Sequence, residues 1–307
     1  MYIKYGIISN NIDVTDICLS KLTYNNIITI PSDEYQRSYY FSDPLFGTLK
    51  SIIIINKDSI TEYEHFYTIK INILDNTITT INNNDINNKI SDIHSKLKIK
   101  YGSFNDELPE QKMVVRYLTG NEKILEIGGN IGRNSLIISH ILETKNASSN
   151  SNTNTNMNFV SLESDINIAN QLRENRDLNN FNFHIESSAL SKRKLIQKGW
   201  DTIVSDTLAD GYQWVNTITL NELNKKYNIE FDTLVLDCEG AFYYILMDMP
   251  EILENITLII MENDYTNINH KIFIDQVLKE NNFYRDYMEG NGWGPCIDYF
   301  FEVWKKE

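Results

Sequence analysis

An apolar strand, a glycine-rich turn and a long helical pattern follow one another at residues 123–142, which read KILEIGGNIGRNSLIISHIL. This succession is typical of the first unit of a βαβ fold, in which helices cover both faces of a mainly parallel sheet. Ligands of such sheets bind at the carboxyl ends of the strands. The segment therefore predicts both a fold class and the edge of the sheet where a site would lie.

The residues on either side of this unit continue the alternation of strands and helices. Further apolar strands are predicted in NFVSLES, NFHIESSAL, FDTLVLDCEG and ITLIIMEND, and helices in ELPEQKMVVRYL and FIDQVLKENNF. Strands that are apolar throughout indicate a sheet buried on both faces. We therefore predict a Rossmann-like, doubly wound α/β domain over residues 91–307.

Residues 1–90 have a different pattern and are predicted to form a smaller β-rich domain. SIIIIN, TIKINI and TITTI are rich in β-branched residues, and Pro31, Pro44 and Gly47 mark turns between strands. The polar run INNNDINNK at 81–89 is interpreted as a boundary loop. A packing surface that joins copies into a homo-oligomer and a glycan-binding module both remain open as roles for this domain.

Composition disfavours several classes of protein. The formal charge of −14 opposes binding to phosphate backbones, so we expect no nucleic-acid partner. No run of eighteen apolar residues indicates a membrane span, and the first residues lack the apolar core of a signal peptide. Three cysteines without a CxxC pair, and five histidines away from them, favour a reducing, cytoplasmic setting and no metal site.

The polar, low-complexity run TKNASSNSNTNTNMN lies at residues 144–158, between the first helix and the second strand of the α/β domain. Its composition cannot supply a packed core, so it is interpreted as a disordered surface loop.

The glycine turn does not match the dinucleotide fingerprint G-x-G-x-x-G. Counting from Gly128, that template requires glycine where the chain has Asn130 and Arg133. What remains is E-x-G-x-x-x-G, from Glu126 to Gly132, with a carboxylate at the end of the strand. Gly128, Gly129 and Gly132 are interpreted as places where the backbone approaches a ligand closely. The alternative is a tight turn without a ligand.

Three carboxylates follow other predicted strands. Glu163 ends NFVSLES, where an acidic residue can accept hydrogen bonds from the hydroxyls of a ribose. Asp237 and Glu239 end an apolar strand and would face the same cleft if that strand continued through them. The alternatives are solvated surface carboxylates and, for Asp237 and Glu239, capping of the next helix.

Together these motifs resemble the FkbM-like family of S-adenosylmethionine (SAM)-dependent methyltransferases. The resemblance covers residues 122–265 and rests on EIGGNIG, SLESD, SSALS, VNTITLNEL, FDTLVLDCEGAFYYIL and IIMEND, in that order. The chain departs from the family mildly, at Glu126, Gly129, Ser164 and Cys238. The resemblance implies a class I methyltransferase domain with SAM as cofactor and a hydroxyl oxygen as methyl acceptor.

The acceptor that the resemblance implies is a sugar, nucleotide sugar, glycan or other small hydroxylated molecule. It assigns the methionine end of SAM to Glu126, Gly128, Asn130 and Gly132, the ribose to Glu163, and the adenine to Ser188 and Ala189. Gly129 and Ser164 are expected as further cofactor ligands. It places Asp237 and Glu239 near the transferred methyl group, with Asp237 also a cofactor ligand, and Glu262 toward the acceptor. One of these three carboxylates is expected to assist catalysis.

Alternatives remain beside this assignment. A dehydrogenase is disfavoured by the failed glycine template, whereas a non-catalytic interaction protein and an RNA-directed methyltransferase stay open on fold alone. GNGWGP at 290–295 is a candidate acceptor-side loop because it is rich in turn residues. Two roles remain possible for the aromatic residues Trp200, Tyr212, Trp214 and Trp293. A sugar could stack on their rings, or the rings could take part in ordinary core or loop packing.

Overall fold

The computed structural model describes residues 1–32, 34–57, 59–149, 158–290 and 292–306, which divide into two compact units, Met1–Asn88 and Lys89–Glu307. The division falls inside helix α3 (Asn83–Lys96). The prediction of a boundary loop at 81–89 is therefore wrong from residue 83 onward. Ile86, Ile90 and Ile93 recur at helical spacing, and all three are buried, so this stretch has the apolar face of a helix.

The first unit is built on two antiparallel sheets of four strands each, in the orders β2-β1-β5-β6 and β3-β4-β7-β8. This confirms the predicted β-rich N-terminal domain, to which the structure adds two helices. Alternate isoleucines such as Ile52 and Ile54 of β5 face the core. The elements are β1 (Tyr2–Ile7), β2 (Asn10–Asp13), α1 (Thr15–Lys21), β3 (Thr23–Tyr24), β4 (Ile27–Ile30), α2 (Glu34–Phe41), β5 (Ser51–Asn56), β6 (Ser59–Tyr63), β7 (Tyr67–Asn72) and β8 (Ile78–Asn82).

The second unit alternates strands and helices along most of its length. Its elements after α3 are α4 (Leu108–Tyr117), β9 (Ile124–Ile127), α5 (Arg133–Ser149), β10 (Phe159–Leu162), α6 (Ile166–Leu178), β11 (His184–Glu186), β12 (Ala189–Leu190), β13 (Leu195–Lys198), β14 (Asp201–Val204), β15 (Gln213–Val215), β16 (Thr217–Ile218), α7 (Leu220–Tyr227), β17 (Thr233–Leu236), α8 (Ala241–Asp248), the 3₁₀ helix η2 (Pro250–Leu253), β18 (Leu258–Glu262), α9 (Ile268–Glu280), β19 (Phe283–Glu289), the 3₁₀ helix η3 (Gly294–Tyr299) and β20 (Phe301–Lys306).

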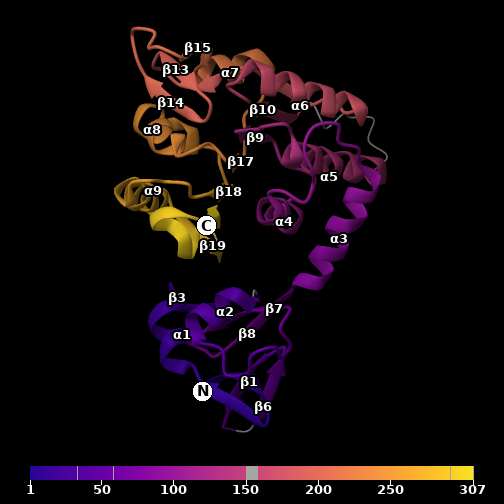
Figure 1. The fold of residues 1–307 in the computed structure, drawn as a ribbon, viewed down its shortest axis with the longest axis vertical. Helices are drawn as coiled ribbons and strands as arrows, with labels where there is room; N and C mark the ends of the chain where they lie inside the picture. Colours follow the sequence, from indigo (N-terminus) through magenta and orange to yellow (C-terminus); the bar gives the residue numbers. More distant parts are fainter. Residues whose placement is uncertain (33, 58, 150–157, 291, 307) are drawn as a thin grey trace. The chain divides into compact units, whose positions relative to one another are not determined.

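The core of this unit is a seven-stranded sheet in the order β11-β10-β9-β17-β18-β20-β19. The first five strands are parallel, and β20 runs antiparallel between β18 and β19. Figure 1 shows α4, α5 and α6 on one side of the sheet and α8 and α9 on the other. The predicted Rossmann-like, mainly parallel, doubly wound sheet is confirmed.

The chain order reverses direction between β9 and β17, which are neighbours in the sheet although β10 to β16 separate them in sequence. This is the topological switch point of the sheet, where open α/β sheets bind their ligands. Both strands are buried along their whole length, and their polar side chains are Thr233, which begins β17, and Glu126, the third residue of β9. Glu126 is a carboxylate near the carboxyl end of β9 and therefore lies beside the point where a ligand is expected.

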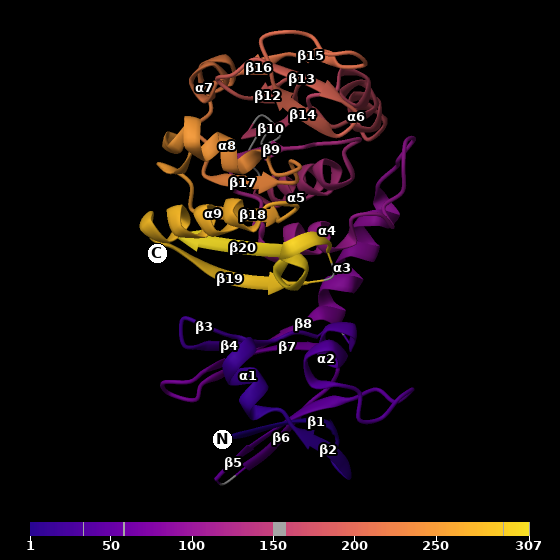
Figure 2. The ribbon, with the colours of Figure 1, turned by 60° about the vertical axis from the view of Figure 1, so that its left-hand side comes forward.

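Strand β20 completes the far half of the sheet, as Figure 2 shows for β18, β20 and β19. Its Glu302 is fully buried and pairs with Lys271 at 2.9 Å and with Arg285 at 2.6 Å. Both cations hold the pKa of Glu302 at about 2, against the effect of burial. This charge network is satisfied within the protein, so we interpret it as structural.

The low-complexity run at 144–158 only partly fits its interpretation as a loop. Residues 144–149 belong to the last turns of α5, so the loop prediction is wrong there, because helix α5 continues past its apolar face. Residues 150–157 lie outside the described residues.

Candidate active site

A recess opens at the carboxyl ends of β9 and β17, next to the start of α4. It is lined by Glu107, Glu110, Glu126, Gly128, Gly129, Asn130, Asn134, Val235 and Asp237. Five of these were predicted as cofactor ligands: Glu126, Gly128, Gly129, Asn130 and Asp237. Glu107, Glu110 and Asn134 were not, because two of them lie in the segment that forms the α4 helix start and the third in α5, away from the strand ends that guided the prediction.

The three glycines of the turn are required by contacts within the protein. A Cβ on Gly128 would lie 1.6 Å from the carbonyl oxygen of Asp237, and Gly128 has a φ of +92°. A Cβ on Gly129 would lie 2.1 Å from Ser161 Oγ, and one on Gly132 would lie 2.3 Å from a methyl group of Leu172. The turn thus packs directly onto β17, β10 and α6, whereas the sequence suggested that the glycines leave room for a ligand.

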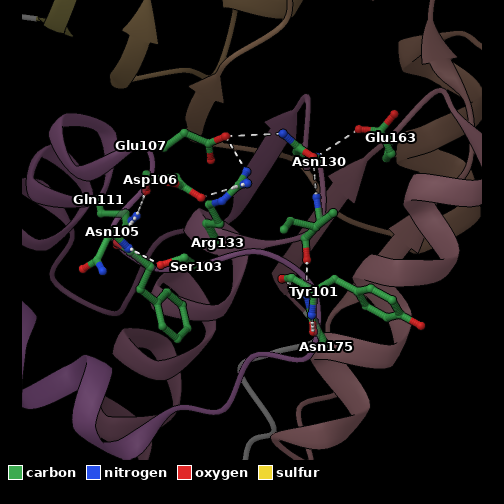
Figure 3. Close-up of polar contacts among 12 residues, drawn as sticks. Tyr101, Ser103, Asn105, Asp106, Glu107, Gln111, Asn130, Arg133, Glu163 and Asn175 are labelled. Atoms are coloured by element: carbon green, nitrogen blue, oxygen red, sulfur yellow. Dashed lines mark hydrogen bonds and ion pairs between the residues drawn. The ribbon is translucent and has the colours of Figure 1, made fainter. Parts of the chain in front are cut away.

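All five backbone N–H groups of the turn donate hydrogen bonds within the protein. Gly128 and Gly129 both donate to the carbonyl of Leu162, at 3.0 and 2.8 Å. Asn130 donates to Glu163 Oε2 at 2.9 Å, as Figure 3 shows. The remaining two bonds are Ile131 to Asn130 Oδ1 at 2.8 Å and Gly132 to the Gly129 carbonyl at 2.9 Å. A phosphate binds at such a turn through N–H groups that point at it, and here those groups are already engaged.

Glu163 is the anion that the turn binds. Its second oxygen, Oε1, accepts the N–H of Asp165 at 2.8 Å. Burial raises the pKa of the Glu163 carboxyl, and the N–H donors of Asp165 and Asn130 act in the opposite direction. A carboxylate offers about four lone-pair positions, so this side chain retains acceptor capacity for the ribose hydroxyls that the sequence assigns to it.

Glu126 lies beneath the turn and is almost fully buried. Its Oε2 accepts hydrogen bonds from the hydroxyls of Ser135 and Ser161, the latter at 2.5 Å. Burial raises the pKa of the Glu126 carboxyl to about 7, and the two serine hydroxyls limit that rise. The Glu126 carboxyl therefore holds its proton to a higher pH than an ordinary glutamate does.

Glu107, which lines the recess at the start of α4, binds the guanidinium of Arg133. Arg133 Nη1 lies 2.5 Å from Glu107 Oε1, and the side-chain amide of Asn130 donates to the same oxygen at 3.3 Å. Figure 3 shows this bridge between the α4 segment and the glycine turn. The side-chain amide of Asn175 also joins these two parts of the chain. It donates to the carbonyl of Ile131 in the glycine turn at 2.8 Å and to the carbonyl of Tyr101, in the segment before α4, at 3.2 Å.

Strand β17 ends at Leu236, so Asp237 and Glu239 do not alternate along one strand as predicted. Glu239 and Gly240 have φ values of +49° and +77° and turn the chain into α8. Asp237 lines the recess, whereas Glu239 is exposed beside it. Asp264, just beyond β18, accepts the N–H of Gly240 at 2.8 Å and fixes this turn.

The carboxyls at the ends of β17 and β18 hold protons more tightly than ordinary acids. Burial and the neighbouring Glu107 and Glu110 raise the pKa of Asp237 well above its usual range. Burial, Asp237 and a contact with Glu110 raise the pKa of Glu262 to about 11. For Asp264, burial and the charge of Glu239 raise the pKa to about 7.

The other predicted ligands lie at the same edge of the sheet but do not line the recess. Ser164 follows β10 and donates its hydroxyl to Gln197 at 3.2 Å. Ser188 follows β11 and donates to Glu186 at 3.1 Å, and Ala189 begins β12. The roles of Ser188 and Ala189 at the adenine and of Ser164 in cofactor binding remain predictions, as does the role of Glu262 toward the acceptor.

The aromatic residues fall into two groups. Trp200 lies between β13 and β14, Tyr212 directly precedes β15, and Trp214 lies in β15. These strands form the small sheet β14-β13-β15, which is inserted between β12 and β16, and both tryptophans are exposed. Trp293 precedes η3, and its ring centroid lies 6.0 Å from that of Phe300. In the 290–295 segment, Asn291 lies outside the described residues.

No protein-family model matches the chain, and no curated protein matches it. Solved structures with a similar fold include an O-methyltransferase from Bacillus cereus in complex with SAH, at 15% identity and a TM-score of 0.39, over 72% of this chain and 88% of that one. A ribosomal protein L11 methylase from Lactobacillus delbrueckii subsp. bulgaricus has 10% identity and a TM-score of 0.40, over 68% and 82%. A tRNA m1G37 methyltransferase from M. jannaschii has 9% identity and a TM-score of 0.36, over 81% and 60%. Likenesses this distant decide neither the family nor the reaction.

Within the described ranges, no helix has both the length and the apolar character that a membrane crossing needs. Over the same residues, no group of three or more histidine, cysteine, aspartate or glutamate side chains is arranged to hold a metal ion.

Proposed function

We propose that the chain is a SAM-dependent methyltransferase that transfers a methyl group to a hydroxyl of a sugar, nucleotide sugar, glycan or other small hydroxylated molecule. The observation that carries this proposal is the glycine turn with all its N–H groups engaged and the carboxylate of Glu163 against it. A dinucleotide would have to place its pyrophosphate beside this carboxylate without a free N–H donor. A cofactor without a phosphate needs no free N–H donor, and a positively charged reacting group is not repelled by the Glu163 carboxylate.

The residues of the recess fit the groups of SAM. Its sulfonium and ammonium are cationic, and Glu126, Asp237 and Glu110 place carboxyl oxygens around the recess. Asn134 Oδ1, on the same lining, is buried and accepts no hydrogen bond within the described structure. Glu163 would hold the ribose. Bound SAM supplies a methyl group on a positively charged sulfur, which leaves as a neutral thioether.

The protein then has to align the acceptor oxygen with the methyl group and remove its proton. In methyl transfer the carbon–sulfur bond breaks, an oxygen–carbon bond forms, and the hydroxyl proton passes to a base. Of the predicted carboxylates, Glu262 is protonated at neutral pH and serves better as a hydrogen-bond donor. Asp237 and Glu239 remain candidates for the base, with Asp237 expected mainly to orient the cofactor.

Asp264 is a better candidate for the base, although sequence reasoning did not select it. A general base is most effective when its pKa is near the working pH, and the pKa of Asp264 is about 7. Its Oδ1 is held by the Gly240 N–H, and its Oδ2 accepts no hydrogen bond within the described structure. The signal was present in the IIMEND motif, but Asp264 follows the strand end by two residues and was passed over for Glu262.

Isothermal titration of the full chain with SAM, S-adenosylhomocysteine (SAH) and NAD⁺ tests the proposal. Binding of SAM and SAH without NAD⁺ supports it, and binding of NAD⁺ alone would replace it with a dehydrogenase. Turnover of labelled SAM against nucleotide sugars and glycans, with tRNA as a separate acceptor, then separates small-molecule from RNA methylation. SAM binding without turnover on any acceptor would favour a non-catalytic role.

A further inference from the structure

Residues 102–107, termed the gate segment, bring Glu107 to the edge of the recess. Side chains join this segment to the glycine turn: Arg133 Nη1 lies 2.5 Å from Glu107 Oε1, and Arg133 Nη2 lies 3.4 Å from Asp106 Oδ2. The side-chain amide of Asn130 also donates to Glu107 Oε1, at 3.3 Å. Figure 3 shows these contacts between the two parts of the chain. All of them are made by side chains, so they can break while the helices and strands stay intact.

The chain is anchored on both sides of the gate segment. Before it, Asn175 and Asn179 of α6 form hydrogen bonds with the backbone of residues 98–101, at 2.7 to 3.2 Å. After it, Gln111 of α4 donates to two backbone carbonyls of the gate segment, at 3.2 and 2.6 Å. The gate segment can therefore move as one piece with the first turn of α4, while the chain before it stays fixed to α6.

The backbone at both ends of the gate segment has the left-handed conformation. Gly102 has a φ of +80° and Glu107 a φ of +57°. Such strain in a residue other than glycine persists only where surrounding contacts hold it, and for Glu107 these are the contacts with Arg133 and Asn130. Loop positions and element ends of this kind can absorb the change in φ and ψ that a hinge requires.

The recess is too small for the proposed cofactor while the gate segment is in this position. It has room for only a few water molecules, whereas sites for small molecules usually enclose about 300–1,000 Å³. Its other walls cannot move easily, because β9 and β17 lie in the middle of the sheet and the glycine turn packs on β17, β10 and α6. The gate segment and the first turn of α4 are therefore the wall that has to move.

We infer that the gate segment controls entry of the cofactor, and that the ion pair between Glu107 and Arg133 holds it closed. The inference rests on the proposed function, which defines the cofactor. When the pair breaks, the gate segment moves Glu107 away from the recess, and Glu110 follows with the first turn of α4. Arg133 is not among the described residues that line the recess. Its replacement therefore opens the gate without removing a contact with the cofactor.

A gate of this kind affects rates more than affinity. Only the open form binds the cofactor, so the observed association rate constant is lowered in proportion to the fraction of molecules that are open. Loss of the charge-assisted hydrogen bonds of Arg133 should raise that fraction about tenfold. Replacement of a residue that contacted the cofactor directly would instead raise the dissociation rate constant and weaken binding.

Surface plasmon resonance with SAH on the immobilised full chain tests the inference. Arg133→Gln should raise the association rate constant about tenfold without weakening affinity. Arg133→Lys keeps a cation beside Glu107 and should remain closer to wild type. Lys100→Gln is the matched control, because it removes the exposed ion pair of Lys100 with Glu174 just before the gate segment. Its association rate constant should equal that of wild type.

Hydrogen–deuterium exchange of the free chain provides a measurement that needs no cofactor. Arg133→Gln should speed the exchange of amides in residues 102–107 about tenfold, while residues 98–101 exchange as in wild type. Glu107→Gln breaks the same ion pair from the other side and provides a second variant if Arg133→Gln fails to fold. Its exchange in residues 102–107 should rise in the same way.

Unchanged exchange in residues 102–107 would overturn the inference, whether or not SAH binds. An association rate constant that stays at the wild-type value in Arg133→Gln, or that rises equally in Lys100→Gln, would overturn it as well. Failure of SAH to bind the wild-type chain would refute the proposed function, whereas SAH binding with an unaltered association rate constant in Arg133→Gln would refute only this inference.

Discussion

The Glu126→Gln substitution should make the α/β unit more stable at alkaline pH. Burial raises the pKa of Glu126 from 4.5 to about 7, so the unfolded chain releases this proton at lower pH than the folded chain does. Below about pH 4 both states hold the proton and no cost arises. As pH rises through the pKa of the folded state, the free energy of unfolding falls by about 3 kcal/mol, because each unit of the pKa shift corresponds to about 1.4 kcal/mol. Glutamine has no charge to bury, and its carbonyl oxygen can still accept the hydrogen bonds from the hydroxyls of Ser135 and Ser161.

Urea unfolding of both proteins from pH 5 to pH 8 measures this effect. The free-energy difference between variant and wild type should be small at pH 5 and approach about 3 kcal/mol in favour of the variant at pH 8. Taking the difference between the unfolding free energies of the two proteins at each pH removes the contributions of other acids such as Glu262 and Asp264. Glu174→Gln is the matched control, because Glu174 is exposed and its substitution should change stability little at either pH. Equal pH slopes for wild type and Glu126→Gln would refute the buried-carboxyl reasoning.

Three further predictions follow from the site. Gly128→Ala should destabilise the unit by more than about 3 kcal/mol, because the new Cβ would lie 1.6 Å from the carbonyl oxygen of Asp237. Gly199 has a φ of +58° and open space around it, so Gly199→Ala should cost only about 1 kcal/mol of backbone strain. Equal losses of stability in thermal unfolding would contradict the packing explanation. Glu163→Ala should weaken SAM binding by about 1–3 kcal/mol through lost charge-assisted hydrogen bonds, and an unchanged calorimetric affinity would remove Glu163 from the site. Asp264→Asn should lower the single-turnover methylation rate by about 10²–10⁴-fold, while SAM affinity is nearly retained. The wild-type rate should rise as pH increases through about 7. A rate that did not depend on Asp264 would leave Asp237 and Glu239 as the candidates for the base.

The sequence was sufficient to predict most of the α/β unit, because its strands are short apolar runs followed by helical patterns. It was misleading where polar composition concealed a helix. Asparagines at 82–84 suggested a loop, but Ile86, Ile90 and Ile93 give that stretch one buried face. Composition records the average polarity of a segment, whereas a helix needs only one apolar stripe.

For the site, the sequence identified carboxylates at strand ends but not the carboxylates that other elements bring to them. Glu110 reads as an ordinary residue of an amphipathic helix, and only tertiary packing places it against Glu262. The turn at Glu239 could not be foreseen either, because its positive φ follows from the path into α8. The glycines were found, but the contacts that require them are made with residues far away in the chain.

The antiparallel strand β20 has a consequence for how the protein is made. It pairs with β18 on one side and β19 on the other, and it is synthesised after every other strand of the sheet. Until residues 301–306 leave the ribosome, β18 presents an unpaired apolar edge and the buried Lys271 lacks Glu302. A nascent or truncated chain that ends before residue 301 should therefore depend on chaperones and aggregate readily, even though the recess, which is built from residues 107–237, would already have been translated.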